Sequence, residues 1–425
     1  MIESIKKMWK IKELRDKIIF TFVMLVIYRL VSAIPAPGVD LAALAAKRAS
    51  IDSNSIFQLI NMMIGGSFSE MSLMAMGITP YINASIIMQL LTIALPVLER
   101  MSQEEDGKEK INRITRYVTV GLAALQAIGL ATTQGVVKNG WLLGISMAGG
   151  TALAMWIGEQ ITKKGIGNGV SLLIFVGIVS NIFTAIVTAL AQAGANGATN
   201  TWIGVAVLLL TVVIITVVVT FVELAERRIP LQISKQVKGR RVYGGQSTHM
   251  SLKVVSVGVL PLIFAYSFLS FPGTIATMIN PNSGFALWCQ RNLSQTSWLY
   301  MVLSALLIIA FTFFYSSISF DPKQQAEQLQ QQGAVIPGQR GKNVRQYLQN
   351  TTNRLNLFAA LFLALLASVT TFLTSRLYSS AGISLGFAAS SILIAVSVSI
   401  ETIRTIQGEM SIRGIDTDVE NMGFM

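Results

Sequence analysis

The sequence predicts an all-α integral membrane protein, and three observations support this fold class. Of the 425 residues, 52% are hydrophobic and only 13% are charged, whereas soluble domains are about a quarter charged. The mean hydropathy is +0.59. Ten apolar segments are long enough to cross a bilayer. Such segments are expected to be helical, because hydrocarbon offers backbone N–H and C=O groups no other partner.

The charge of the connecting loops supports the number of spans. The spans are predicted at residues 18–34, 73–95, 114–133, 142–160, 170–191, 202–221, 254–271, 298–320, 355–373 and 383–403. An even number places both termini on one side, and the termini and loops of that side hold 27 of the 33 Lys and Arg residues. The positive-inside rule therefore places both termini in the cytoplasm. A missed span would reverse every later loop and destroy this asymmetry.

The order of long and short loops predicts two inverted halves. Small residues at 194–200 divide the chain into five spans and five. A long outer loop follows the first span of the first half, and a long inner loop follows the first span of the second, as inversion requires. The predicted organisation is an N-terminal half (1–193), a hinge loop (194–200) and a C-terminal half (201–425). The inner loops 223–253 and 321–354 are basic, which suits anionic lipid, RNA or a protein partner, although topology alone also explains it.

The sequence shows no recognisable catalytic or metal-binding motif. His249, the single histidine, lacks the motif partners of a zinc or nucleophilic site. Cys289, the single cysteine, excludes an internal disulfide. The GIGNG segment at 165–169 joins two spans rather than a strand and a helix, so it is predicted to be a tight turn. We therefore expect no enzymatic activity, no cofactor and no metal ion.

Polar residues within the spans separate two classes of function. An ion-coupled carrier usually holds ionisable residues near the membrane midplane, but Glu159, Glu223 and Glu401 fall at the cytoplasmic ends of their spans. The midspan amides are expected mainly to form interhelical hydrogen bonds; they belong to Asn83, Gln89, Gln126 and Asn181. A passive conduit fits better, and an ion-coupled secondary transporter of a small solute remains the alternative.

The segment NSIFQLINMMIGG, at 54–66, is apolar but too short to cross the membrane. As a helix, residues 55–64 would reach about 15 Å, half of the hydrocarbon core. Gly65 and Gly66 follow as a stop signal. One face of the helix is apolar and consists of Ile56, Phe57, Ile60, Met63 and Ile64. An amphipathic half-length helix on the outer side is able to lie on the membrane surface.

Five motifs resemble the SecY family, the central subunits of bacterial protein-conducting channels. They are IPAPGVD (34–40), GITPYINASIIMQLL (77–91), GEQITKKGIGNGVS (158–171), GRRVYGGQSTH (239–249) and GAVIPGQR (333–340). The resemblance implies an hourglass pore between two inverted halves of five helices, in the bacterial cytoplasmic (inner) membrane. Unfolded polypeptides cross its waist, and signal sequences and transmembrane segments leave sideways into the lipid bilayer. The implied partners are SecE-like and SecG-like subunits, with the SecA ATPase or a ribosome as the drive.

The resemblance also assigns roles to residues. It implies an apolar pore ring at Ile78, Ile82, Val170, Ile174, Ile263 and Ile394. Ile78 and Ile82 are four positions apart, as are Val170 and Ile174, so each pair presents two β-branched side chains on one helix face. An apolar constriction of this kind blocks ions by expelling water. The half-length helix becomes a plug beneath the ring, hinged at Gly65 and Gly66. Cytoplasmic partner binding is implied at Arg240, Arg241 and Arg340.

The chain departs from the family pattern in several places. RGKN, beginning at Arg340, replaces an R-P-G-E-like turn, and Val255 stands where the family's L-P-L-K-x-N motif has Asn. Ala388 and Ala389 replace a common Gly–Gly pair. Val170 has one methylene less than isoleucine, which predicts a looser ring that relies more on the plug for closure.

Overall fold

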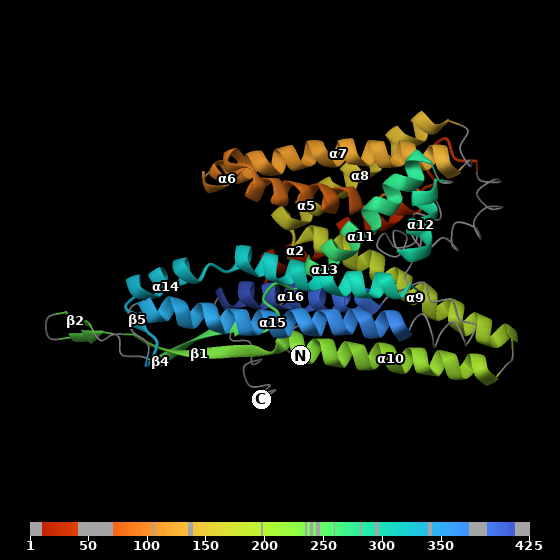
Figure 1. Ribbon diagram of the computed structural model, residues 1–425. Coiled ribbons are helices and arrows are strands. Elements are labelled where there is room, and N and C mark those ends of the chain that lie inside the picture. Colours follow the sequence, from red (N-terminus) through yellow and green to blue (C-terminus); the bar gives the residue numbers. More distant parts are fainter. Residues whose placement is uncertain are drawn as a thin grey trace.

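The structure, a computed structural model, consists mainly of long helices that lie side by side (Figure 1). It describes residues 11–40, 71–104, 107–134, 139–196, 199–233, 236–238, 241–243, 247–258, 260–280, 283–293, 297–338, 342–373 and 389–412. The predicted plug, 55–64 with its two glycines, lies outside the described residues.

Each of the ten predicted spans overlaps a helix. In chain order these are α2 (Lys12–Ser32), α5 (Thr79–Ala94), α7 (Gly107–Gln134), α8 (Gly140–Lys164), α9 (Gly169–Asn196), α10 (Thr199–Leu224), α11 (Leu260–Ile279), α13 (Trp298–Ser319), α15 (Lys342–Leu373) and α16 (Ala389–Ile412). By length and apolar composition, five helices of the described chain are able to cross a membrane, or six if α5 and its bent continuation count as one span. For the others, crossing remains a prediction.

Helix α5 begins at Thr79, later than the predicted start of its span at residue 73. Gly77 has a φ of 50°, which suits glycine but interrupts a right-handed helix. Pro80 then occupies the first turn, where its missing N–H costs no hydrogen bond. At the other end, Leu95 is extended because a proline follows it. The chain bends there by 104° into α6 (Pro96–Gln103).

Helix α15 begins at Lys342, so the end of the predicted loop 321–354 is helical. The first turns of α15 are polar, so hydropathy placed the start of the predicted span only at residue 355. Leu348 is nevertheless fully buried in these turns. Leu348 packs in a cluster with Ile229, Leu329 and Ile336. The start of the same predicted loop forms α14 (Pro322–Gln331), whose N-cap Asp321 accepts a hydrogen bond from the Lys323 backbone N–H at 2.8 Å.

A small sheet corrects the all-α prediction, although the molecule is mostly helical. Strand β1 (Glu226–Ile233) lies between β4 (Ser247–Lys253) and β5 (Ala334–Val335), and both pairings are antiparallel. Two further strands, β2 (Gln236–Lys238) and β3 (Arg241–Tyr243), pair separately. Along β1, Ile229 and Leu231 are buried whereas Pro230 and Gln232 are exposed, which is the alternation of a half-buried strand. This alternation is present in the sequence, but the overall polarity of the loop predicts no element.

The sheet marks one end of the molecule. The strands, α14 and α6 lie at this end, and α12 (Gly284–Asn292) lies at the other (Figure 1). The C-terminal end of α9 and the N-terminal end of α10 also lie at the α12 end. Helix α9 continues to Asn196 and α10 begins at Thr199, so both helices extend into the predicted hinge loop 194–200.

Two large apolar clusters lie between the described helices. The first joins α10, α11, α13, α15 and α16, with buried Leu262, Ile308, Leu363 and Leu393 at its centre. The second draws buried residues from α2, α5, α8, α9, α11, α13 and α16, and thus from both predicted halves. The second cluster contains the candidate site.

Candidate functional site

The residues of the predicted pore ring converge in the second cluster. Ile78 and Ile82 come from the start of α5, Ile174 from α9, Ile263 from α11 and Ile394 from α16, and each is only 5 or 6% exposed. Val170 is partly buried and packs against the same cluster. Residues separated by more than 300 positions in the sequence therefore meet in one apolar group. No local pattern in the sequence requires this meeting, which the family resemblance implied.

The turn between α8 and α9 fixes the position of Val170. Asn168 Oδ1 accepts hydrogen bonds from the backbone N–H groups of Val170 at 3.1 Å and Ser171 at 3.4 Å, and so caps α9. The Thr162 hydroxyl on α8 accepts a hydrogen bond from the Gly169 N–H at 2.9 Å. Gly167 has a φ of 75°, a conformation that favours glycine. The prediction that GIGNG is a tight turn between two spans is confirmed.

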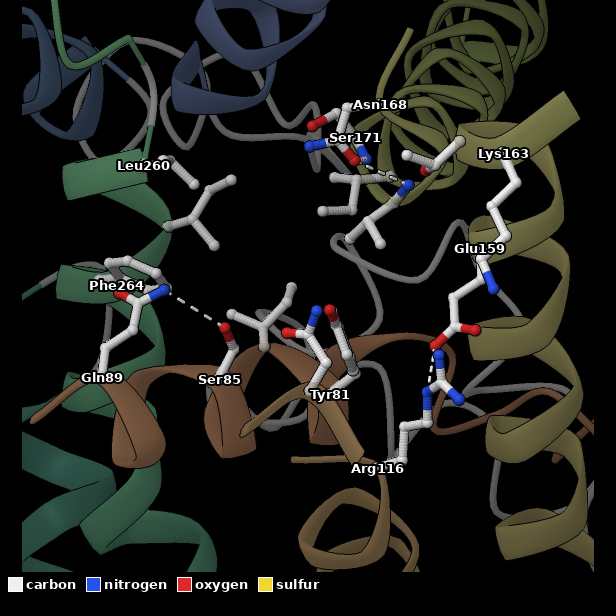
Figure 2. Close-up of a pocket in the computed structure, with 16 residues that line it drawn as sticks. Tyr81, Ser85, Gln89, Arg116, Glu159, Lys163, Asn168, Ser171, Leu260 and Phe264 are labelled. Carbon is white, nitrogen blue, oxygen red and sulfur yellow. Dashed lines mark hydrogen bonds and ion pairs between the residues drawn. The ribbon is translucent and has the colours of Figure 1, made fainter. Parts of the chain in front are cut away.

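A cavity of about 440 Å³ lies against the ring residues. Ile82, Val170, Ile174 and Ile263 form part of its lining. Figure 2 shows its polar lining: Tyr81, Ser85 and Gln89 from α5, Glu159 and Lys163 from α8, and Asn168 and Ser171 near the start of α9. Leu260 and Phe264 of α11 lie across the cavity from the α8 and α9 residues. The cavity thus has an apolar side made by the ring and a wall rich in hydrogen-bonding groups.

An ion pair lies in the cavity wall. Arg116 Nε on α7 and Glu159 Oε1 on α8 are 2.6 Å apart (Figure 2). The side chains are 40% and 23% exposed, so water reaches both of them. Because each charge also has an oppositely charged partner, its partial burial is tolerated. The position of Glu159 near the end of α8 agrees with its predicted place at the end of a span. The pair ties two neighbouring helices of the first half together.

A second polar contact in the lining joins helices of different halves. Tyr315 on α13 donates a hydrogen bond from its hydroxyl to Gln89 Oε1 on α5. Gln89 Nε2 in turn donates to Ser85 Oγ at 3.4 Å. The Tyr315 ring stacks on Phe264 of α11, with the ring centroids 4.7 Å apart. The expected interhelical bonding of Gln89 is confirmed. Tyr315 was not a candidate in the sequence, because a tyrosine in an apolar helix gives no sign of its partner.

The remaining predicted site residues lie away from this cluster or outside the described chain. Arg241 begins β3 at the sheet end, whereas Arg240 and Arg340 are not among the described residues. The same holds for the plug residues Ile56, Phe57, Ile60, Met63, Ile64, Gly65 and Gly66. Within the described ranges, no three His, Cys, Asp or Glu side chains gather as metal ligands. His249 is exposed on β4 opposite Pro230.

Comparison of the sequence with known proteins gives near full-length matches. The SecY family model matches residues 72–403. The chain is 37% identical over 441 residues to the protein translocase subunit SecY of Streptomyces scabiei, covering 98% of this chain and 99% of that protein. It is 39% identical over 442 residues to the protein of the same name from Corynebacterium glutamicum, covering 96% and 98%.

Solved structures share the fold. One described as "The structure of a protein conducting channel" matches with a TM-score of 0.70 at 20% identity, over 93% of this chain and 92% of that one. The structure of a SecY protein whose plug domain is described as maintaining a membrane seal matches with a TM-score of 0.67 at 20% identity and the same coverage. Sec61 in a canine ribosome-channel complex from the endoplasmic reticulum matches at 0.65 and 18%, again over 93% and 92%.

Proposed function

This chain belongs to the SecY family, and from that premise we propose that it forms a passive channel through which unfolded secretory polypeptides cross the bacterial cytoplasmic membrane. The observation that carries the proposal is the convergence of the six ring residues beside a polar cavity. An apolar constriction excludes water and ions at rest, but a polypeptide that fills it passes without needing a charged binding site. The ring is the seal, and the cavity is the vestibule on the sheet side.

The proposed architecture is ten transmembrane helices in two inverted halves, hinged at 194–200. The composition of the second cluster supports this division, because it lies where helices of residues 1–193 meet those of 201–425. Signal sequences and transmembrane segments would leave through one lateral exit, which is bordered by α5 and α7 on one side and by α11 and α13 on the other. The hydrogen bond from Tyr315 to Gln89 crosses this exit, so lateral opening requires that bond to break.

We assign the segment 55–64 as the plug on the outer side of the ring, with Gly65 and Gly66 as its hinge. Its support is the amphipathic pattern in the sequence, together with the plug described for the SecY structure that shares the fold. The apolar face of the plug would pack on Ile78 and Ile82. The sheet end is assigned to the cytoplasm, with both termini there, on the strength of the positive-inside pattern.

The proposed partners dock at the sheet end. Arg240, Arg241 and Arg340 are assigned to partner binding, because guanidinium groups form forked contacts with carboxylates and phosphates. The SecA ATPase or a translating ribosome supplies the drive, and SecE-like and SecG-like subunits complete the complex. The ribosome-bound channel complex that contains Sec61 supports the ribosome as a partner. The relatives and structures reported above are translocase channels, which gives the ion-coupled transporter no support.

Reconstitution tests this proposal. The chain is placed in proteoliposomes with its SecE-like and SecG-like subunits, and SecA, ATP and a radiolabelled preprotein are added. We expect ATP-dependent protection of the preprotein from external protease, and no protection of a matched protein that lacks its signal sequence. Absence of protection with every partner present would contradict the channel. Gradient-driven solute uptake by vesicles that hold this chain alone would instead favour the transporter.

A further inference from the structure

The sheet-side end of α16 makes an ion pair with the first half of the molecule. Lys17 Nζ on α2 lies 2.5 Å from Glu409 Oε1 on α16. The two residues are 392 positions apart in sequence. Their side chains are 35% and 26% exposed, so solvent screens this pair less than a fully exposed one.

A small apolar core accompanies the ion pair. Leu14 of α2, Ile166 of the α8–α9 turn and Met410 of α16 are buried together, with exposures of 0, 4 and 3%. The turn is also fixed to α2, because the Thr21 hydroxyl accepts a buried hydrogen bond from the Ile166 backbone N–H at 3.0 Å. Three segments therefore meet at one point, and two of them belong to the predicted N-terminal half.

The opposite side of α16 is attached to the C-terminal half. Arg404 Nη2 lies 3.2 Å from Glu226 Oε1 at the start of β1, and these side chains are 25% and 28% exposed. Ser397 donates a hydrogen bond to Glu223 Oε1 on α10 at 2.6 Å. Helix α16 is thus held to the sheet and α10 by one set of polar contacts, and to α2 by another.

The same helix supplies a ring residue. Helix α16 is continuous from Ile394 to Glu409, a distance of about 22 Å at 1.5 Å per residue. Movement of its sheet-side end therefore moves Ile394. The other partner of the small core, the α8–α9 turn, leads directly into Val170. Two ring residues from different halves are each connected through rigid elements to the site of the ion pair.

We propose that the Lys17–Glu409 pair and the core of Leu14, Ile166 and Met410 form a clasp that holds the two halves together at the sheet end and keeps the ring closed at rest. The proposal rests on the proposed function as a channel. When the clasp loosens, α16 separates from α2 and the α8–α9 turn, and Ile394 withdraws from the ring. Loss of the charge attraction should therefore increase the resting leak of ions.

Charge exchange tests the clasp. Lys17→Glu and Glu409→Lys each place like charges in contact, and the double variant restores an opposite pair. The measurement is the resting conductance per channel of the reconstituted complex in planar bilayers, without SecA. We expect each single variant to raise the conductance about fivefold, as a partly buried ion pair allows, and the double variant to return it to within about twofold of the original.

A matched control comes from an exposed pair on α7. Arg113 and Glu109 are 3.9 Å apart with side chains 65% and 81% exposed, so Arg113→Glu, Glu109→Arg and their combination should leave the conductance unchanged. Thermal unfolding in detergent identifies any variant that fails to fold. Single variants of the clasp with the original conductance, or a folded double variant that leaks as much as either single one, would overturn the proposal.

A reversible cross-link provides a second measurement. Lys17→Cys and Glu409→Cys are combined in a Cys289→Ala background and joined by a short, cleavable bis-maleimide. We expect the cross-link to stop SecA-driven translocation and its cleavage to restore it, whereas unhindered translocation through the cross-linked channel would refute the clasp. If the channel without the cross-linker translocates nothing, the proposed function is contradicted. The resting conductance of the charge-exchange variants then still shows whether the clasp holds the ring closed.

Discussion

Individual glycines set how closely the helices of the first half approach. A Cβ atom added to Gly150 on α8 would lie 1.9 Å from the backbone oxygen of Leu73, the segment that leads into α5. Backbone atoms cannot yield as the end of a flexible side chain can, so the whole segment would have to shift. The neighbouring Gly149 has no atom within 4 Å of such a Cβ. A larger side chain is therefore excluded by sterics at position 150 but has free space at position 149.

Alanine substitutions test this contrast. Gly150→Ala should lower the free energy of unfolding by about 1–3 kcal/mol, the usual cost of overpacking. Gly149→Ala should be neutral or should stabilise by up to about 1 kcal/mol through helix propensity. Thermal and denaturant unfolding of the purified protein in detergent measures both. Equal effects for the two variants would show that the close approach to Leu73 does not limit the packing.

At the residue scale, the family resemblance led to six residues that the structure brings together in one apolar cluster, whereas the polar pairs between distant helices were not predicted. The resemblance to the SecY family implied the ring residues, and helical spacing supports only the two pairs Ile78/Ile82 and Val170/Ile174. The partners Lys17 with Glu409 and Tyr315 with Gln89 could not be predicted, since each joins helices far apart in the chain. A single sequence carries no information on which distant positions are in contact in the fold. Their signals, a lysine or a tyrosine near a helix end, are common and nonspecific.

At the scale of elements, hydropathy predicts the existence of the helices well, because each predicted span overlaps a helix, but it predicts their ends poorly. The ends depend on backbone chemistry, such as Gly77 and Pro80 at the start of α5, and on polar helical turns that continue beyond the apolar segment, as in α15. The sheet was missed because β1 and β4 lie in a loop whose average composition is polar. A test for alternation within polar loops would have found Ile229 and Leu231.

The plug and the ring are expected to share the closure of the pore. Deletion of residues 55–64 should leave a folded channel with a higher resting ion conductance, because the ring would close the pore alone. Val170→Ile in the deletion background should reduce that leak, since one added methylene narrows the ring. Planar-bilayer recording of the reconstituted complex measures both effects. An unchanged resting conductance after the deletion would argue against the plug, and an unchanged leak after Val170→Ile would argue against the looser ring.

At the scale of the whole molecule, the distribution of Lys and Arg predicts which end faces the cytoplasm. Cysteine labelling tests this orientation in intact cells, starting from Cys289→Ala. The native thiol is fully buried in α12, and burial raises its pKa, so it should react slowly even before replacement. Arg227→Cys on β1 and Arg291→Cys on α12 introduce exposed thiols at opposite ends.

A membrane-impermeant maleimide should label the cysteine at position 291 in intact cells but label the one at 227 only after the cells are broken. This is the expectation because the basic sheet end is assigned to the cytoplasm. The labelled fraction at each position, measured by gel shift against a denatured total, gives the result. The reverse pattern would invert the assigned topology and move the cavity to the outer side.

The sheet has a thermodynamic consequence for docking. Residues 334–335 belong to one predicted loop and residues 226–253 to another, yet Val335 pairs with Gln232 and Ala334 with Ile233 in one antiparallel ladder. Fixing the backbone of a flexible residue costs about 1–2 kcal/mol, and a partner that had to order two separate loops would lose that much affinity for each residue it immobilised. Because the strands are already ordered in the folded chain, this entropy is spent during folding rather than during association. The described strands β1, β4 and β5 therefore form a single preorganised surface to which both loops contribute.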